Sequence, residues 1–157
     1  MGKYSRDLNE ALEEKVKSIA AATGFREMGI TVEAVRAKKC KTYGEIVKPN
    51  DLTKLFLGDD DTIVIALYED LFDLVDEETQ NYWIEALLAQ VWYDNEKEKM
   101  VVTKPELAVS LAMYHKYKNV AVQKEELAVL TIQQIEQKKK EEKEAKRAAK
   151  EAKKKNK

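Results

Sequence analysis

The amino-acid sequence predicts an α+β fold, in which a small mixed sheet packs on a central apolar helix and a long charged C-terminal helix projects from the domain. Two observations lead to this prediction. Short β-branched runs alternate with segments whose apolar residues recur at helical spacing. The last twenty residues, from Lys138, contain no large apolar side chain and have no face to bury. The 157 residues are 44% hydrophobic, which suffices for one domain with a core.

The first third of the chain predicts one helix followed by two strands. A helix is expected over residues 5–23, with Gly24 as its stop, because apolar residues recur at helical spacing: Leu8, Ala11, Leu12, Val16, Ile19 and Ala20. Residues 30–36 alternate and are rich in β-branched side chains, so they predict a strand. Residues 43–47 predict a second, short strand, and Pro49-Asn50-Asp51 a turn.

Residues 62–68 are the clearest strand prediction. The run Ile63-Val64-Ile65-Ala66-Leu67 is almost continuously apolar, which predicts burial on both faces. Three aspartates, Asp59-Asp60-Asp61, precede it, and carboxylates are ligands for hard cations. They lack the spacing of a calcium loop, so a solvated turn is the favoured interpretation.

The central helix is predicted to begin after Asp76, which can cap it, with Glu77 and Glu78 favourable in the first turn. Its apolar stripe is expected to lie in the core and consists of Trp83, Ile84, Leu87, Leu88, Val91 and Trp92. A charged turn at 94–99 and an extended segment at 100–102 follow.

Two further helices are predicted after this segment. Thr103 and Glu106 have the spacing of a capping box and open a helix that ends near Lys118. Its expected apolar face comprises Leu107, Leu111 and Tyr114. The last helix is expected to begin near Gln123, with a stripe of Leu127, Leu130 and Ile135.

Charge divides the chain into an acidic domain, 1–136, and a basic tail, 137–157. The total charge is -1, but from Lys138 onward eleven Lys and Arg stand against four Glu, a net of +7 that leaves -8 for the preceding residues. Ala, Glu, Lys and Arg favour a helix that leaves the domain near Glu136. The tail is either a solubilising segment or an attachment to nucleic acid or an acidic protein surface. The candidate binding residues are Lys138, Lys139, Lys140, Lys146, Arg147, Lys150, Lys153, Lys154 and Lys155.

No catalytic or metal constellation is predicted. One histidine, His115, excludes a site built on two imidazoles within this chain, and it is interpreted as structural or solvated near a helix end. Cys40 lies between Lys39 and Lys41, which should lower its thiol pKa, but no partner nearby in sequence suggests catalysis. No cofactor motif is present, and no apolar run approaches the ~20 residues that span a bilayer.

The order of the predicted strands and helices from residue 30 to residue 118 resembles that of the phage metallopeptidase-like family, a zincin-like group found in bacteriophage genomes. The segments that carry the resemblance are Val32–Lys38, Ile63–Leu67, Leu71–Leu74, Asp76–Glu78, Tyr82–Val91, Thr103–Leu107 and Tyr114–Tyr117. Active zincins carry H-E-x-x-H on their central helix, where two histidines hold zinc and the glutamate activates water. The matching window here is Ala86-Leu87-Leu88-Ala89-Gln90, which has none of these residues.

The resemblance therefore implies a fold that has kept its shape and lost its zinc site. The expected function is a non-enzymatic bacteriophage accessory or interaction protein with a protein partner from phage or host, located in the host cytoplasm or the virion. Nucleic-acid binding through the basic tail is the main alternative. A virion or assembly component and a residual enzyme that uses carboxylates alone are two others, and the oligomeric state stays open.

Overall fold

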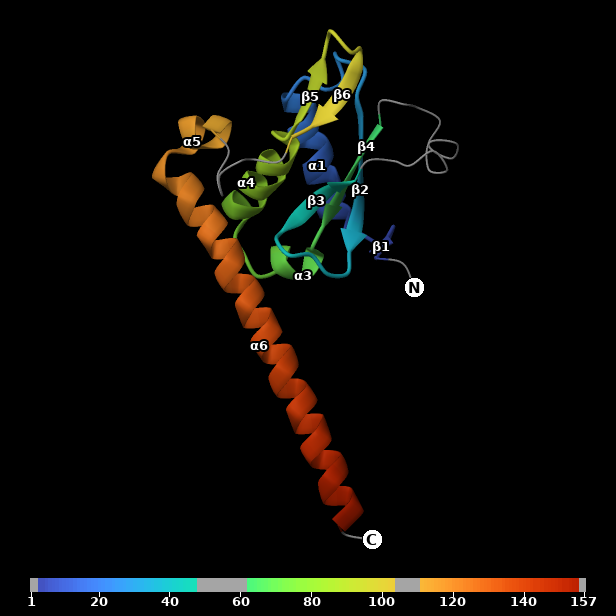
Figure 1. Cartoon of the computed structure of the whole chain (residues 1–157), viewed down its shortest axis with the longest axis vertical. Helices are drawn as coiled ribbons and strands as arrows, with labels where there is room; N and C mark the ends of the chain where they lie inside the picture. Colours follow the sequence, from blue (N-terminus) through green and yellow to red (C-terminus); the bar gives the residue numbers. More distant parts are fainter. Residues whose placement is uncertain (1–2, 48–61, 104–110, 156–157) are drawn as a thin grey trace.

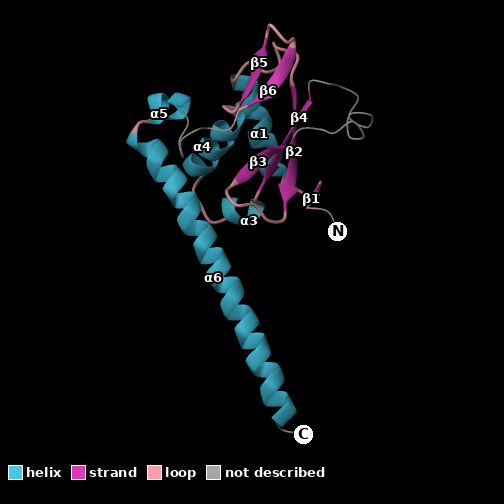
Figure 2. Ribbon diagram, in the orientation of Figure 1, coloured by secondary structure: helices cyan, strands magenta, loops and turns pink. Residues whose placement is uncertain are grey.

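The computed structural model describes residues 3–47, 62–103 and 111–155, and it confirms the α+β class. A body of strands and helices occupies one end of the molecule, and a single long helix runs away from it to the C-terminus (Figure 1). Figure 2 shows α4, α5 and the start of α6 to the left of the strands, with α1 overlapping the strands in this view and α3 below them. None of the helices in the described part of the chain has the length and apolar character needed to cross a membrane.

The main sheet is small and mixed, as predicted. Its four strands are β1 (Tyr4–Ser5), β2 (Thr31–Ala37), β3 (Gly44–Val47) and β4 (Thr62–Leu67), and they lie in the order β1-β2-β4-β3. The two central strands, β2 and β4, are parallel, and both edge strands are antiparallel to them. The strands expected at 30–36, 43–47 and 62–68 are confirmed to within one residue at most ends.

Helix α1 (Glu10–Ala22) begins later than the predicted residue 5. Asn9 is the N-cap, and its side-chain oxygen accepts a hydrogen bond from the Ala11 amide at 2.9 Å. Ser5 belongs to β1 instead, because it pairs with Arg36 across the sheet. Gly24 follows the helix at a φ of +79°, a left-handed conformation that glycine adopts readily, so the predicted stop is confirmed.

Helix α4 (Glu77–Leu88) is the central apolar helix, and the short α3 (Glu69–Phe72) precedes it. The predicted cap is confirmed, since Asp76 accepts a hydrogen bond from the Thr79 amide at 2.9 Å. The predicted stripe is wrong at its end. Val91 and Trp92 lie in strand β5 (Val91–Asp94), which pairs with β6 (Lys99–Val102), and Trp92 is 47% exposed.

Helices α5 (Leu111–Tyr117) and α6 (Asn119–Lys155) follow the hairpin. The last helix begins four residues before the predicted Gln123, and Leu130 of its predicted apolar stripe is 55% exposed, whereas Ile135 of the same stripe is buried. Tyr114, predicted on the apolar face of the preceding helix, is exposed too. The other side chains that α6 buries are small or β-branched, namely Ala121, Ala128 and Thr131.

Several sequence predictions fall outside the described residues. They are the turn at Pro49-Asn50-Asp51, the solvated turn at Asp59-Asp60-Asp61, the capping box of Thr103 with Glu106, and the apolar position at Leu107.

The core lies between one face of the sheet and α4. Ile63, Ile65 and Leu67 of β4 are fully buried on that face, and Trp83, Ile84 and Leu87 of α4 are buried with them. On the opposite face of β4, Ala66 is buried and Val64 half-buried, so the predicted burial of both faces is largely confirmed.

Candidate functional site

The window that aligns with H-E-x-x-H lies at the end of α4. Ala86, Leu87 and Leu88 are buried in its last turn, whereas Ala89 is the C-cap and Gln90 lies beyond the helix. Two ligands four residues apart share a face only where the helix continues through both. These positions therefore offer neither ligand atoms nor a common helical face.

The described residues hold no arrangement typical of a metal centre. Among residues 3–47, 62–103 and 111–155, no group of three or more His, Cys, Asp or Glu side chains is placed to hold an ion. Glu85, next to the window, already accepts hydrogen bonds from Lys116 and from the hydroxyl of Tyr117. His115 is exposed in the last turn of α5.

The prediction for Cys40 is wrong in its sign. The thiol is buried, and burial, with a contribution from the charge of Glu45, raises its pKa to about 11. Lys39 and Lys41 are exposed, so their charges are screened by solvent and do not offset the burial. The structure thus argues against a reactive thiolate at this position.

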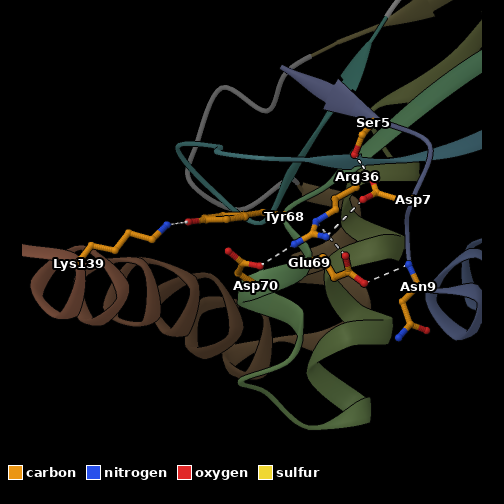
Figure 3. Close-up of polar contacts among 8 residues, drawn as sticks. All are labelled: Ser5, Asp7, Asn9, Arg36, Tyr68, Glu69, Asp70 and Lys139. Carbon is orange, nitrogen blue, oxygen red and sulfur yellow. Dashed lines mark hydrogen bonds and ion pairs between the residues drawn. The ribbon is translucent and has the colours of Figure 1, made fainter. Parts of the chain in front are cut away.

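A cluster of charged residues lies where the parallel strands β2 and β4 end, a location at which many α/β proteins bind ligands (Figure 3). Arg36 Nε lies 3.0 Å from Glu69 Oε2, and Arg36 Nη2 lies 3.2 Å from Asp70 Oδ1. Glu69 also accepts the backbone amide of Asn9 at 3.1 Å. The Asp7 carboxylate is 3.8 Å from Arg36 Nη1, and a hydrogen bond from Ser5 lowers its pKa.

This cluster joins β1, β2 and α3 rather than presenting a free ligand set. The guanidinium of Arg36 is shared among three carboxylates. Sequence reasoning missed it, because its members come together only through strand pairing. We interpret it as a structural ion-pair network that fixes the end of the sheet next to α6.

An apolar hollow of about 770 Å³ lies between α4, the β5–β6 hairpin and α5. Its lining includes Phe25, Met28, Leu88, Trp92 and Met113. The described lining is mainly apolar. Its carboxylate, Glu85, already accepts hydrogen bonds from Lys116 and Tyr117 and is not free to bind a ligand.

Helix α6 is fixed to the body through its first half. Trp83 Nε1 donates to the carbonyl of Lys124 at 3.0 Å, and the Lys124 ammonium donates to Thr79 Oγ1 at 2.7 Å. Ala121, Ala128 and Ile135 recur every seven residues on the side that meets the body. Small residues at two of these positions allow the helix to approach closely.

Glu125 adds a polar contact to this attachment, and its carboxylate is expected to make stability depend on pH. Its carboxylate accepts a hydrogen bond from the Tyr43 hydroxyl at 2.8 Å, and burial raises its pKa despite that bond. A raised pKa in the folded state makes a contribution to stability that is complete below the unfolded pKa and is lost as pH rises through the folded pKa. We therefore expect Glu125→Gln to be more stable than the parent chain at pH 7, with the difference shrinking toward pH 4.

Urea unfolding of both proteins between pH 4 and pH 7 measures this difference. Tyr43→Phe is the control, because loss of the hydroxyl donor should raise the pKa of Glu125 further and move the pH dependence upward. Equal stability of Glu125→Gln and the parent chain across the range would contradict the expectation.

Beyond the body, α6 continues as an exposed helix. Ile135 is its last buried side chain, and every side chain from Glu136 to Lys155 is exposed. Lys139 makes a contact back to the body, with Nζ 3.4 Å from the Tyr68 hydroxyl (Figure 3). The sequence from Asn119 to Lys155 is thus one continuous helix, anchored at one end and projecting at the other (Figure 1).

The positive charges of the projecting part gather on one side of the helix. At 3.6 residues per turn, eight of the ten Lys and Arg from 138 to 155 fall within an arc of about 140°. We call these eight residues the basic face: Lys139, Lys140, Lys143, Lys146, Arg147, Lys150, Lys153 and Lys154. Ala145, Ala148, Ala149 and Ala152 lie on the opposite side.

The candidate binding residues from the sequence agree in part with this face. Seven of the nine belong to it, whereas Lys138 and Lys155 fall outside the arc. Lys143 belongs to the basic face and was missed. Lys143 could have been found from its spacing to Lys139, Lys146 and Lys150. This spacing places the four residues on one face only if the segment is a helix.

The chain thus combines an α+β body with a projecting basic helix. No family model, curated protein or solved structure matches the chain.

Proposed function

We propose that the chain is a non-enzymatic binding protein that presents the projecting end of α6 to a polyanionic partner. The observation that carries the proposal is the basic face, eight cations on one side of an exposed helix. Clustered cations on a surface attract polyanions over distances of about a Debye length, roughly 10 Å.

The helical form of the extension supports this role. The residues that precede Lys138 have a net charge of -8, so a flexible tail of net +7 would fold back on its own body. One helix runs from the anchored part to Lys155 and holds the cations away from the body (Figure 1). Lys139 contacts Tyr68 of the body, so the part of the basic face from Lys140 to Lys154 is the part available to a separate partner.

The test is retention of the full chain on immobilised heparin, a generic polyanion. We expect the parent chain to bind at low salt, and a variant with Lys143, Lys146, Arg147 and Lys150 changed to Gln to elute at a clearly lower salt concentration. The matched control changes four exposed cations of the body to Gln, namely Arg26, Lys39, Lys41 and Lys97.

Both variants have the same net charge, so a difference between them isolates the position of the charges. The control is expected to elute close to the parent chain. Failure of the parent chain to bind, or equal elution of the two variants, would contradict the proposal.

The wider proposal keeps the body as a scaffold on a metallopeptidase-like fold, in a bacteriophage accessory protein of the host cytoplasm or virion. Its support is the resemblance in the order of segments from residue 30 to residue 118, and the window at Ala86–Gln90, without zinc-binding histidines, favours a non-enzymatic role. A virion or assembly component is the second candidate, and the exposed side chains of Val129 and Leu130 on α6 favour it.

A further inference from the structure

We propose that the partner of the basic face is duplex DNA in the B form, bound through phosphates on both sides of the major groove. This inference rests on the proposed function, since it names the polyanion that the same helix binds. Four features of the projecting helix support it.

The composition of the basic face favours phosphates over an acidic protein surface. Protein interfaces generally have a core that is depleted in charge and enriched in aromatic and large apolar side chains. The basic face consists of Lys and Arg alone, and the opposite side offers only the small side chain of Ala among apolar types. Phosphate contacts need no apolar core, because their free energy comes largely from counterion release.

The absence of aromatic residues favours a duplex over a single strand. Proteins that hold single strands stack the bases on aromatic side chains. The sequence of α6, Asn119–Lys155, contains no Phe, Tyr or Trp. Its cations can neutralise the phosphates of a duplex, whose bases are already stacked on one another.

The dimensions of the basic face fit the major groove of B-form DNA. Beyond Lys139, which contacts the body, Lys140 and Lys154 are about 21 Å apart along the helix axis at 1.5 Å per residue. A helix of roughly 10–12 Å diameter enters a groove about 12 Å wide. One edge of the face carries Lys146 and Lys153, and the other carries Lys140 and Arg147, so the two edges can reach opposite strands.

The acidic residues restrict binding to this one side. Glu141, Glu142, Glu144 and Glu151 all fall outside the arc of the basic face. Carboxylates there repel phosphates and offset the charge of Lys138 and Lys155, so contact with DNA is favoured on the basic face. The separation of basic and acidic residues around the helix therefore favours one orientation, with the basic face toward the DNA.

A rearranged chain tests the inference without changing composition. Four adjacent pairs exchange places, through Ala145→Lys with Lys146→Ala, Arg147→Ala with Ala148→Arg, Ala149→Lys with Lys150→Ala, and Ala152→Lys with Lys153→Ala. Net charge and helix propensity are preserved, but four cations leave the basic face. Far-ultraviolet circular dichroism and the urea midpoint check that both chains fold alike.

The probe is a fluorescein-labelled 20-base-pair DNA of mixed sequence, followed by anisotropy at several salt concentrations. Lys139 contacts Tyr68, so seven cations of the face remain for phosphates, and the parent chain is expected to give a slope of log K against log salt of about -6, that is ~0.9 per contact. The rearranged chain should lose about half of this slope and bind at least about tenfold more weakly at 0.1 M salt. The corresponding RNA duplex should also bind more weakly, because the A-form major groove is too narrow for a helix.

The outcomes separate this inference from the proposed function. Equal DNA binding by both chains would show that the basic face does not bind DNA. Equal or tighter binding of RNA duplex or single-stranded DNA would show that the helix does not bind in the major groove of B-form DNA. Retention on heparin without binding to the DNA probe would point to an acidic protein and overturn the inference alone. If the parent chain fails to bind heparin as well, the proposed function itself is wrong.

Discussion

Replacing Trp83 by Ala is expected to lower the free energy of unfolding by about 3–5 kcal/mol. Trp83 is 0% exposed, and its ring stacks on Tyr43 at a centroid distance of 5.1 Å. The edge of Phe72 meets it at 5.4 Å. Removal of the indole leaves a cavity between α4, β3 and α6 and also removes the aromatic contacts.

The same substitution loosens the projecting helix. The indole Nε1 donates to the carbonyl of Lys124, so its loss removes a tie between α4 and α6. Trp83→Phe keeps an aromatic ring and loses this donor, and we expect it to lie between the parent chain and Trp83→Ala in stability. It provides the measurement if the alanine variant does not fold.

Urea unfolding monitored by circular dichroism measures these differences. Trp92→Ala is the matched control, because Trp92 is 47% exposed and its Nε1 donates to Thr103. We expect this control to lose only about 1 kcal/mol, the scale of one hydrogen bond and partial burial. Equal losses at the two tryptophans would show that α4 does not place Trp83 in the core.

The contrast between the two tryptophans shows where sequence reasoning succeeds. Strand β4 and the first turns of α4 have strong local signals, namely a β-branched run and an N-capping aspartate. The end of α4 has none that is decisive. Val91 and Trp92 fall at helical spacing from Leu87 and Leu88, although they pair with β6 in the structure. Periodicity alone does not distinguish the end of a helix from the start of an apolar strand.

The prediction of the buried face of α6 was partly wrong for a different reason. The sequence prediction looked for large apolar residues and selected Leu127, Leu130 and Ile135, of which Ile135 is buried and Leu130 exposed. The side that meets the body carries the small residues Ala121 and Ala128 as well as Ile135. Such a face depends on the partner helix, and its pattern is weak in a single segment.

The candidate site divides in the same way. The Arg36 network depends on strand order and on the pairing of β1 with β2, so no local pattern reports it. The basic face is different, since its spacing is local and can be read from the sequence once the segment is taken as a helix. The prediction counted the cations and missed Lys143 because it did not place them around the helix axis.

Replacing Gly44 by Ala is expected to cost about 1–3 kcal/mol of stability, the range typical of overpacking a core. An added Cβ would lie 2.6 Å from the carbonyl oxygen of Ala66 and 2.8 Å from Leu87 Cδ1. The leucine side chain can rotate away, but the carbonyl belongs to the central strand β4 and is fixed by its neighbours on both sides. The cost therefore falls on the pairing of β3 with β4.

Position 44 requires glycine because a side chain there has no space. A comparison with Gly29 separates this steric effect from the effect of backbone conformation. Gly29 has a φ of +73° and no atom within 4 Å of an added Cβ, so Gly29→Ala tests left-handed strain alone, about 1–2 kcal/mol. Gly44→Val should be worse than Gly44→Ala because it adds atoms to the same contact, whereas the Cβ of an alanine at position 29 meets no atom within 4 Å. Urea unfolding of the three variants gives the comparison. If Gly44→Ala and Gly44→Val both retain the stability of the parent chain, β3 does not pack this closely against β4 and Leu87.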